Sequence, residues 1–325
     1  MAEPPADGVA ARESTGGPGG LARRAVRKIT GDVGRAIGPF SRFCRRFWRE
    51  SRLAWTAAGP RGLLRHYAER SHLWWLRMTG RGQSEAELVR ATTRYWNEGD
   101  KAGIDLGDYS HWLGRGPWQD REKWLALGRV HFEMYEQLCQ ATNTTRPLRN
   151  CVEWGCGGGA NAIHFIHEVQ AFCGIEIAEA SLKECGRVLE EAGFTGFQPV
   201  LIPAETPEKA IELAPGPFDF FLSAYVFELL PGKGYGERVA RVAWQLLKPG
   251  GLALIQIRYD DGSPRSTQKN IDYFRHASRF TSYRVEEFWT MMEAIGFQPL
   301  YVRLVPRQVD GYSGDRYAYF MMLKP

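Results

Sequence analysis

The second half of the chain alternates between short apolar runs and amphipathic helical patterns, and this alternation most constrains the fold. The apolar runs cover residues 151–154, 171–177, 197–202, 218–227 and 252–259. Helical patterns over 160–169, 181–193 and 236–251 follow the first, second and fourth runs. Strands that alternate with helices in this way pair in parallel, with helices on both faces of the sheet.

The end of the chain shows a different pattern. A helical pattern over 284–297 is followed by two apolar runs, 298–305 and 316–324, and the loop between them has no helical pattern. Two strands joined without a crossover helix pair antiparallel. We therefore expect an α/β fold with a doubly wound seven-stranded sheet of six parallel strands and one antiparallel strand, preceded by a helical N-terminal extension.

The first apolar run leads into the segment CVEWGCGGGANAI, Cys151 to Ile163, which is rich in glycine. Such a turn lets the backbone approach a ligand closely at the edge where parallel strands end. Gly155, Gly157 and Ala160 also satisfy G-x-G-x-x-A, the pattern of dinucleotide-binding turns. The glycines alone therefore indicate a nucleotide-type ligand without identifying it.

Two glutamates help to separate the possible ligands. Glu153 precedes the first glycine by two residues, where a carboxylate would repel the pyrophosphate of a dinucleotide and attract an ammonium and a sulfonium. Glu176 lies 21 residues after Gly155, at the end of the second run, where a carboxylate accepts hydrogen bonds from ribose hydroxyls. Glu176 fits either kind of cofactor, whereas Glu153 favours a cationic one.

At these positions the sequence resembles the class I S-adenosylmethionine-dependent methyltransferases. The turn from Glu153 to Gly159 is similar to their first motif. Three later segments resemble their further motifs in the same order: GIEIAEASL (174–182), FDFFLSAYVFELLP (218–231) and LLKPGGLALI (246–255). The two closing strands also match this Rossmann-like fold. The resemblance covers about Asp120 to Pro325.

The resemblance implies S-adenosylmethionine as the cofactor. It implies that Glu153 faces the methionine end, that Glu176 binds the ribose and that Ile177 lies against the adenine. The two residues after the third run would contact the adenine amine, and the two after the fourth would line the floor of the site. The expected cofactor-binding residues are Glu153, Gly155, Cys156, Gly157, Gly159, Glu176, Ile177, Ala204, Glu205, Ser223 and Ala224.

Methyl transfer to an oxygen needs a base that removes the proton of the acceptor. The polar segment 259–283 contains the candidates His276 and Asp260, and His111 lies in an aromatic segment before the sheet. His276 is also consistent with an exposed helix residue, and His111 with a turn residue packed on Trp112. The six cysteines form no CxxC pair and no His/Cys cluster at zinc-ligand spacing, so we expect no metal site.

Composition divides the chain before the sheet into three segments. Residues 1–20 are rich in Pro, Gly and Ala and predict a disordered tail. Residues 21–82 interleave arginines with aromatic residues and predict a basic amphipathic helical extension. Residues 83–119 resemble an aromatic cap, and the methyltransferase domain would cover 120–325. Residues 1–82 carry 16 Lys and Arg against 6 Asp and Glu, whereas the remainder carries 26 against 31.

Three interpretations of the basic extension stay open: contact with an anionic membrane surface, binding of nucleic acid, and packing of a helical hairpin on the main domain. No recognised motif supports nucleic acid. No apolar run is long enough to span a bilayer, and no secretory leader is recognisable, so we expect a cytoplasmic protein that becomes peripheral to the membrane if residues 21–82 bind lipid. The sequence indicates no particular oligomeric state.

We therefore expect an S-adenosylmethionine-dependent methyltransferase that methylates a hydroxyl of a small molecule or a glycan, including a lipid-linked acceptor if the extension binds a membrane. Two other classes stay open. A nicotinamide-dependent oxidoreductase is favoured by the G-x-G-x-x-A pattern. A catalytically silent methyltransferase-like binding domain is consistent with intact cofactor motifs and no clear catalytic base.

Overall fold

The computed structural model describes residues 59–61, 63–64, 67–98, 120–144, 148–263, 266–305 and 316–325, without the side chain of Ser278. The expected disordered tail, most of the basic extension, and the part of the expected cap that contains His111 lie outside the described residues. The chain divides into two units, Met1–His66 and Tyr67–Pro325. All the elements below belong to the second unit.

Seven strands form one sheet in the order β3-β2-β1-β4-β5-β7-β6. The pairs among β1 to β5 are parallel, and β7 runs antiparallel to both β5 and β6. The expectation of six parallel strands and one antiparallel strand is thus confirmed. The strands are β1 (Asn150–Trp154), β2 (Ala171–Glu176), β3 (Phe197–Leu201), β4 (Phe218–Ser223), β5 (Leu247–Arg258), β6 (Gln298–Val305) and β7 (Tyr317–Leu323).

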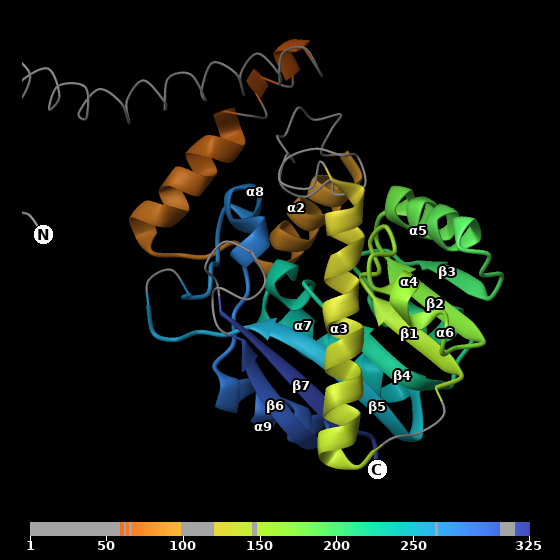
Figure 1. The fold of residues 1–325 in the computed structure, drawn as a ribbon. Coiled ribbons are helices and arrows are strands. Elements are labelled where there is room, and N and C mark those ends of the chain that lie inside the picture. Colours follow the sequence, from red (N-terminus) through yellow and green to blue (C-terminus); the bar gives the residue numbers. More distant parts are fainter. Residues whose placement is uncertain are drawn as a thin grey trace, which may run out of the picture. The chain divides into compact units, whose positions relative to one another are not determined.

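Helices cover both faces of this sheet, as Figure 1 shows. The apolar cluster on one face includes residues of α3, α4 and α5, and the cluster on the other face includes residues of α6, α7 and α9. The helices are α2 (Glu85–Glu98), α3 (Arg121–Thr142), α4 (Ala162–Phe165), α5 (Glu179–Glu191), α6 (Lys209–Leu213), α7 (Lys233–Leu246), α8 (Tyr273–His276) and α9 (Val285–Ile295). A further helix covers residues 67–79.

Side chains of the central strands alternate between the two apolar clusters. On β5, Leu252 and Leu254 pack against the α3 face, whereas Ala253 and Ile255 pack against the α7 face. Such a sheet is buried on both sides, which explains why its strands read as continuous apolar runs in the sequence. Parallel pairing brings the carboxyl ends of β1, β2, β4 and β5 to one edge of the sheet.

Three details differ from the pattern expected from the sequence. Strand β4 ends at Ser223, because the chain turns at Tyr225, which has a φ of 58°. Helix α4 is a single turn, since residues after Ile166 bend toward β2. Helix α7 ends at Leu246 and β5 begins directly after it, where Leu247 pairs with Phe218.

Helix α3 contacts the glycine-rich turn backbone to backbone. A Cβ atom built on Gly128 would lie 1.8 Å from the carbonyl oxygen of Ala160 and 2.7 Å from the Cα of Asn161. Only a glycine at this position lets α3 come so close to the turn. The ring of Trp124, one turn earlier on α3, lies against Gly158. The helix therefore covers the turn and restricts its position.

We predict that Gly128→Ala lowers the free energy of unfolding by about 1–3 kcal/mol, because the new methyl group must push α3 and the turn apart. Urea denaturation followed by circular dichroism measures this change. Gly186→Ala on α5 is the matched control, since its Cβ would lie at an ordinary 3.5 Å from the ring of Phe197. Equal stability of the two variants would contradict the tight contact.

Candidate active site

The chain leaves β1 through a turn that only glycine permits at its first position. Gly155 has a φ of 74°, and its N–H donates to the carbonyl oxygen of Ile175 at 2.8 Å. A Cβ atom at this position would lie 2.4 Å from Cγ2 of Val226. Both the backbone conformation and the contact therefore exclude a side chain, and the turn stays open at the carboxyl edge of the sheet.

Glu153, the penultimate residue of β1, is a fully buried carboxylate. Its Oε1 accepts a hydrogen bond from Nδ2 of Asn161 at 2.5 Å, while its Oε2 is buried without a hydrogen-bond partner among the described residues. Burial raises the pKa of Glu153 to about 8, although the bond from Asn161 opposes this rise. Because an unpaired buried carboxylate oxygen is costly, this position favours a cation or a hydrogen-bond donor.

A chain of buried side chains orients the Glu153 carboxylate. Nδ1 of His131 lies 2.6 Å from Oδ1 of Asn161, and Nε2 of His131 lies 3.0 Å from the hydroxyl of Tyr319. Since Asn161 donates its amide N–H to Glu153, its oxygen must accept a hydrogen bond from the Nδ1–H of His131. Nε2 of a neutral His131 then accepts from Tyr319, and burial lowers the pKa of His131 to about 4, which keeps the ring neutral.

Glu176 ends β2 directly beside the turn. Its Oε1 accepts the N–H of Gly157 at 2.9 Å, and its Oε2 accepts the N–H of Ile177 at 3.0 Å. Burial raises the pKa of Glu176, while these backbone N–H groups act against the rise. A carboxylate has about four acceptor positions, so Glu176 keeps further positions for hydroxyl groups of a ligand.

The other expected cofactor residues lie at the same edge. Helix α7 holds the segment after β3, because the hydroxyl of Tyr235 donates to the carbonyl oxygen of Ala204 at 2.8 Å and Arg238 donates to that of Glu205 at 3.0 Å. At the end of β4, the buried Ser223 donates to the carbonyl oxygen of Trp154 at 3.3 Å, and Ala224 is buried beside it.

Cys156 differs in the direction of its side chain. Its sulfur points into the core, where a Cβ atom on Gly174 would lie 2.7 Å from it. Two effects raise the pKa of the Cys156 thiol: a hydrogen bond with Cys185, which is the larger effect, and burial. Only the backbone of Cys156 is therefore available to a ligand. Trp154 likewise packs in the apolar core, which accommodates its bulk inside the motif.

Helix α2 crosses this edge of the sheet and links its parts. Nδ2 of Asn97 donates to the carbonyl oxygen of Ile177 at 3.1 Å, next to Glu176. Nε1 of Trp96 donates to the hydroxyl of Tyr273 on α8 at 3.2 Å, and that hydroxyl donates to the carbonyl oxygen of Leu229 at 2.6 Å. In Figure 1, α2 and α8 lie at the edge where the parallel strands end.

Sequence reasoning missed three of these residues, namely His131, Asn161 and Asn97. Asn161 lies two positions after the last glycine of the turn, and a polar residue there is a usable signal. His131 lies at apolar helical spacing between Gly128 and Met134, so nothing local distinguishes it from a core residue. Asn97 meets Ile177 across 80 positions of the chain, and no local pattern predicts such a contact.

The candidate bases occupy different environments. Asp260 accepts the hydroxyl of Ser266 at 2.7 Å and the N–H of Gly262 at 2.9 Å, and these bonds, led by that of Ser266, lower its pKa. Such a carboxylate is a weak base. His276 ends α8 and is half-buried, and burial lowers its pKa, so the ring is neutral at physiological pH. His111 lies outside the described residues.

No group of three or more His, Cys, Asp or Glu side chains in the described ranges is arranged to hold a metal ion. The described thiols, Cys139, Cys151, Cys156, Cys173 and Cys185, are free and buried.

We predict that the free energy of unfolding of the wild type falls between about pH 4.5 and 8, and that Glu153→Gln removes this fall. The raised pKa means that folded Glu153 keeps its proton in this window while the unfolded chain has lost it, so this group destabilises the fold as pH rises. The effect is on the order of a few kcal/mol, and urea unfolding across the pH range measures it. Glu179→Gln, at an exposed position, serves as the control, and an unchanged slope in Glu153→Gln would contradict the burial.

Solved structures with this fold include methyltransferases with bound S-adenosylhomocysteine. A magnesium protoporphyrin IX methyltransferase from Synechocystis is 12% identical, with a TM-score of 0.50, and the match covers 73% of this chain and 100% of that one. An N-methyltransferase from Bradyrhizobium japonicum is 14% identical with a TM-score of 0.45, covering 73% and 98%. A didemethyltoxoflavin methyltransferase from Burkholderia thailandensis is 19% identical with a TM-score of 0.47, covering 69% and 89%. At these identities the likeness concerns the fold alone.

No curated protein sequence matches the chain significantly. A family of methyltransferase domains, by contrast, matches residues 129–302, which is more than half of the 325 residues. This range runs from α3 to β6 and includes the glycine-rich turn, Glu153 and Glu176. The chain therefore belongs to the methyltransferase domain family, the class I S-adenosylmethionine-dependent enzymes that its motifs resemble.

Proposed function

We propose that the protein binds S-adenosylmethionine at the glycine-rich turn and transfers its methyl group to a hydroxyl of a small molecule or a glycan. The observation that carries the proposal is the pair of carboxylates on either side of the turn. Glu153 has a buried oxygen without a hydrogen-bond partner among the described residues, and Glu176 keeps acceptor positions for a diol. A ligand with an ammonium group and a ribose satisfies both.

The residues present fit this cofactor in charge as well as in hydrogen bonding. A cation next to Glu153 would stabilise the ionised form and so reverse the effect of burial on its pKa. Bound S-adenosylmethionine supplies a methyl group that is already activated on a sulfonium. The protein then has to position the acceptor and exclude water. Helix α2, which joins Ile177 to α8, is placed to do both.

The same charges speak against a nicotinamide-dependent oxidoreductase. A pyrophosphate beside the fully buried Glu153 would place an anion where burial already disfavours the ionised carboxyl group. A catalytically silent domain is opposed by the cost of keeping Glu153 buried and half-paired, since a domain without a cofactor gains nothing from it.

For an oxygen acceptor we propose His276 as the base. Its ring is neutral at physiological pH, and its helix α8 contacts α2 through Tyr273 and Trp96. Asp260 is less suited, because its Oδ1 is occupied by the turn that follows β5. His111 stays a candidate from the sequence.

We further propose a cytoplasmic location. Among the described residues no helix is long and apolar enough to cross a membrane.

We predict that Glu176→Ala weakens binding of S-adenosylmethionine and S-adenosylhomocysteine about 10- to 100-fold, because hydrogen bonds between the ligand and the Glu176 carboxylate are lost. Calorimetric titration of wild type and variant measures the loss, with NAD as the competing ligand. Glu179→Ala removes an exposed carboxylate three positions later and should bind like wild type. Binding of NAD alone, or of none of the three nucleotides, would overturn the proposed function.

We also predict that His276→Gln lowers kcat by about 100-fold or more for a hydroxyl acceptor, with little change in cofactor affinity. Transfer of a labelled methyl group to a panel of phenols, sugars and amines measures this rate, and the wild-type rate should rise with pH as His276 loses its proton. Asp260→Asn is the comparison variant. A panel in which only amines are methylated, or a His276→Gln variant with wild-type rates on hydroxyls, would contradict the assignment.

A further inference from the structure

Large apolar side chains gather on the outer face of the helix over residues 67–79. Four are exposed there: Tyr67 by 39%, Trp74 by 63%, Trp75 by 44% and Met78 by 68%. Among the described residues after Tyr67, the other exposed large apolar side chains are spread over four elements, and only Tyr301 and Leu304 share one, β6: Val130, Leu201, Leu213, Tyr301 and Leu304. Exposed apolar residues that cluster, unlike single ones, mark a binding surface.

The spacing of these residues shows that they form one face. Positions 67, 74 and 78 follow the i, i+7, i+11 pattern of a helical stripe, and Trp75 lies beside Trp74. We call Tyr67, Trp74, Trp75 and Met78 the outer aromatic face. The opposite side of the helix carries Leu76, which is only 4% exposed. The helix thus buries Leu76 on one side, while Trp74 and Met78 on the other side are 63% and 68% exposed.

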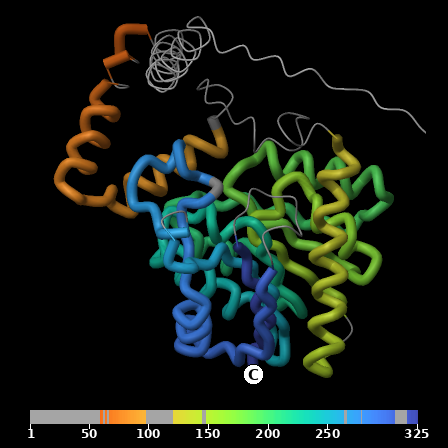
Figure 2. Tube along the Cα trace, turned by 60° about the vertical axis from the view of Figure 1, so that its left-hand side comes forward, coloured from red at the N-terminus to blue at the C-terminus, as the bar shows by residue number. Residues whose placement is uncertain are grey.

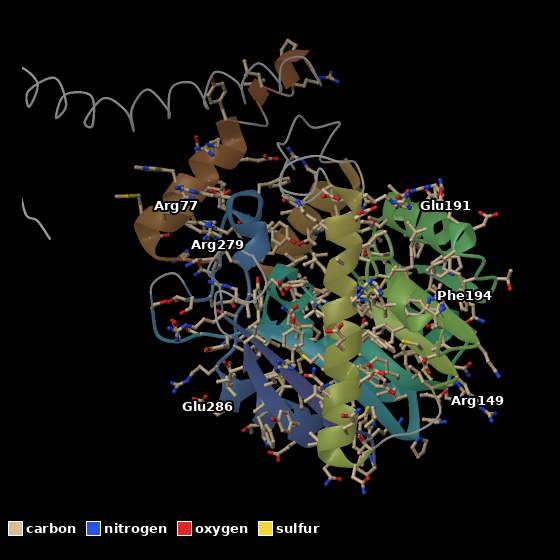
Figure 3. All side chains as sticks on the ribbon, in the orientation of Figure 1. Arg77, Arg149, Glu191, Phe194, Arg279 and Glu286 are labelled. Atoms are coloured by element: carbon tan, nitrogen blue, oxygen red, sulfur yellow. The ribbon has the colours of Figure 1, made fainter. Side chains whose placement is uncertain are left out.

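Polar contacts hold the helix in this orientation. Arg77 forms an ion pair with the buried Asp272 at 2.6 Å, and His72 lies 3.0 Å from Glu87 of α2. The segment after the helix is held by a hydrogen bond from the N–H of Gln83 to the carbonyl oxygen of Asn270 at 2.8 Å. Figure 2 shows the helix beside α8, and Figure 3 labels Arg77 on the helix near Arg279. The exposed side chains therefore lie on a helix that is held against the rest of the unit by its other contacts.

Positive charge accompanies the outer aromatic face. The guanidinium of Arg81 lies 5.4 Å from the ring centroid of Trp75, and Arg77 is 38% exposed at its side chain. Residues 67–82, which contain the helix and the segment after it, carry three arginines against one glutamate, a net charge of +2. A partner for this surface should be apolar and negatively charged.

We propose that the outer aromatic face inserts into the interface of an anionic lipid bilayer. Tryptophan and methionine provide apolar bodies for the acyl boundary, and the indole N–H groups can reach the headgroups. The guanidinium of Arg81, beside Trp75, pairs with anionic headgroups. A second copy of this chain fits less well, because two such surfaces would bring like charges together.

The ion pair between Arg77 and Asp272 determines which part of the protein would lie beside the membrane. Because the helix is tied to the segment that contains α8, a membrane bound at the outer aromatic face would lie beside that segment. A membrane-bound or lipid-linked acceptor would then be close to His276. The membrane contact itself does not depend on the proposed methyl transfer.

The test uses the full chain and sedimentation with vesicles, either of phosphatidylcholine alone or with about one third phosphatidylserine. We expect binding to the anionic vesicles, weakened by salt. The double variant Trp74→Ser with Met78→Ser should bind about tenfold more weakly, since two exposed apolar side chains no longer enter the lipid. The matched control Tyr301→Ser with Leu304→Ser removes exposed apolar residues from β6 and should bind like wild type.

Three results would overturn the proposal. The first is that wild type binds neither kind of vesicle, and the second is that the two double variants bind equally. The third is that light scattering shows an oligomer of the wild type that is lost in Trp74→Ser with Met78→Ser, since the face would then contact a second copy of the chain. Titration with S-adenosylhomocysteine checks that both double variants are folded. It also distinguishes the two proposals. If wild type bound the nucleotide but no vesicles, only the proposed membrane contact would be contradicted. Vesicle binding without nucleotide binding would affect only the proposed function.

Discussion

The contact between Gly128 and the backbone at Ala160 is the constraint on which the rest of the site depends. It holds α3 close to the glycine-rich turn, and that closeness places His131 within hydrogen-bond distance of Asn161. Asn161 in turn orients the carboxylate of Glu153. A methyl group at position 128 would therefore act on the electrostatics of β1 through two intervening side chains. The surrounding chain leaves the other oxygen of this carboxylate without a hydrogen-bond partner among the described residues, and such local strain is typical of functional sites.

The sequence predicts much of this arrangement because the signals are local. Apolar runs of four to ten residues, interrupted by helical patterns, correspond to the five parallel strands of the first half of the fold. The glycines and the two glutamates lie at fixed offsets from the ends of β1 and β2, so their meeting at one edge follows from parallel pairing. The family match confirms the predicted family, and the pairing of β5 with β7 confirms the predicted antiparallel strand. Both predictions also depend on local sequence patterns.

The remaining features depend on contacts that are distant in the chain. His131 meets Tyr319 across 188 positions, and Trp96 meets Tyr273 across 177. Short elements are equally hard to predict: α6 and α8 have five and four residues, too few for a periodic pattern. The expected base Asp260 illustrates a related limit, because residue type suggests a base, whereas the turn around Ser266 decides how strong that base is.

Because β7 runs antiparallel to β5 and β6, the chain ends at the edge of the sheet opposite the glycine-rich turn. Tyr317 pairs with Arg258 at the edge where the glycine-rich turn lies, and Leu323 pairs with Leu252 at the other edge. Figures 1 and 2 accordingly show the C-terminus at the edge opposite α2 and α8. With seven residues, β7 carries the chain roughly 20 Å away from the cofactor edge. Anything attached after Pro325, such as an affinity handle or a solid support, would leave the cofactor edge unobstructed.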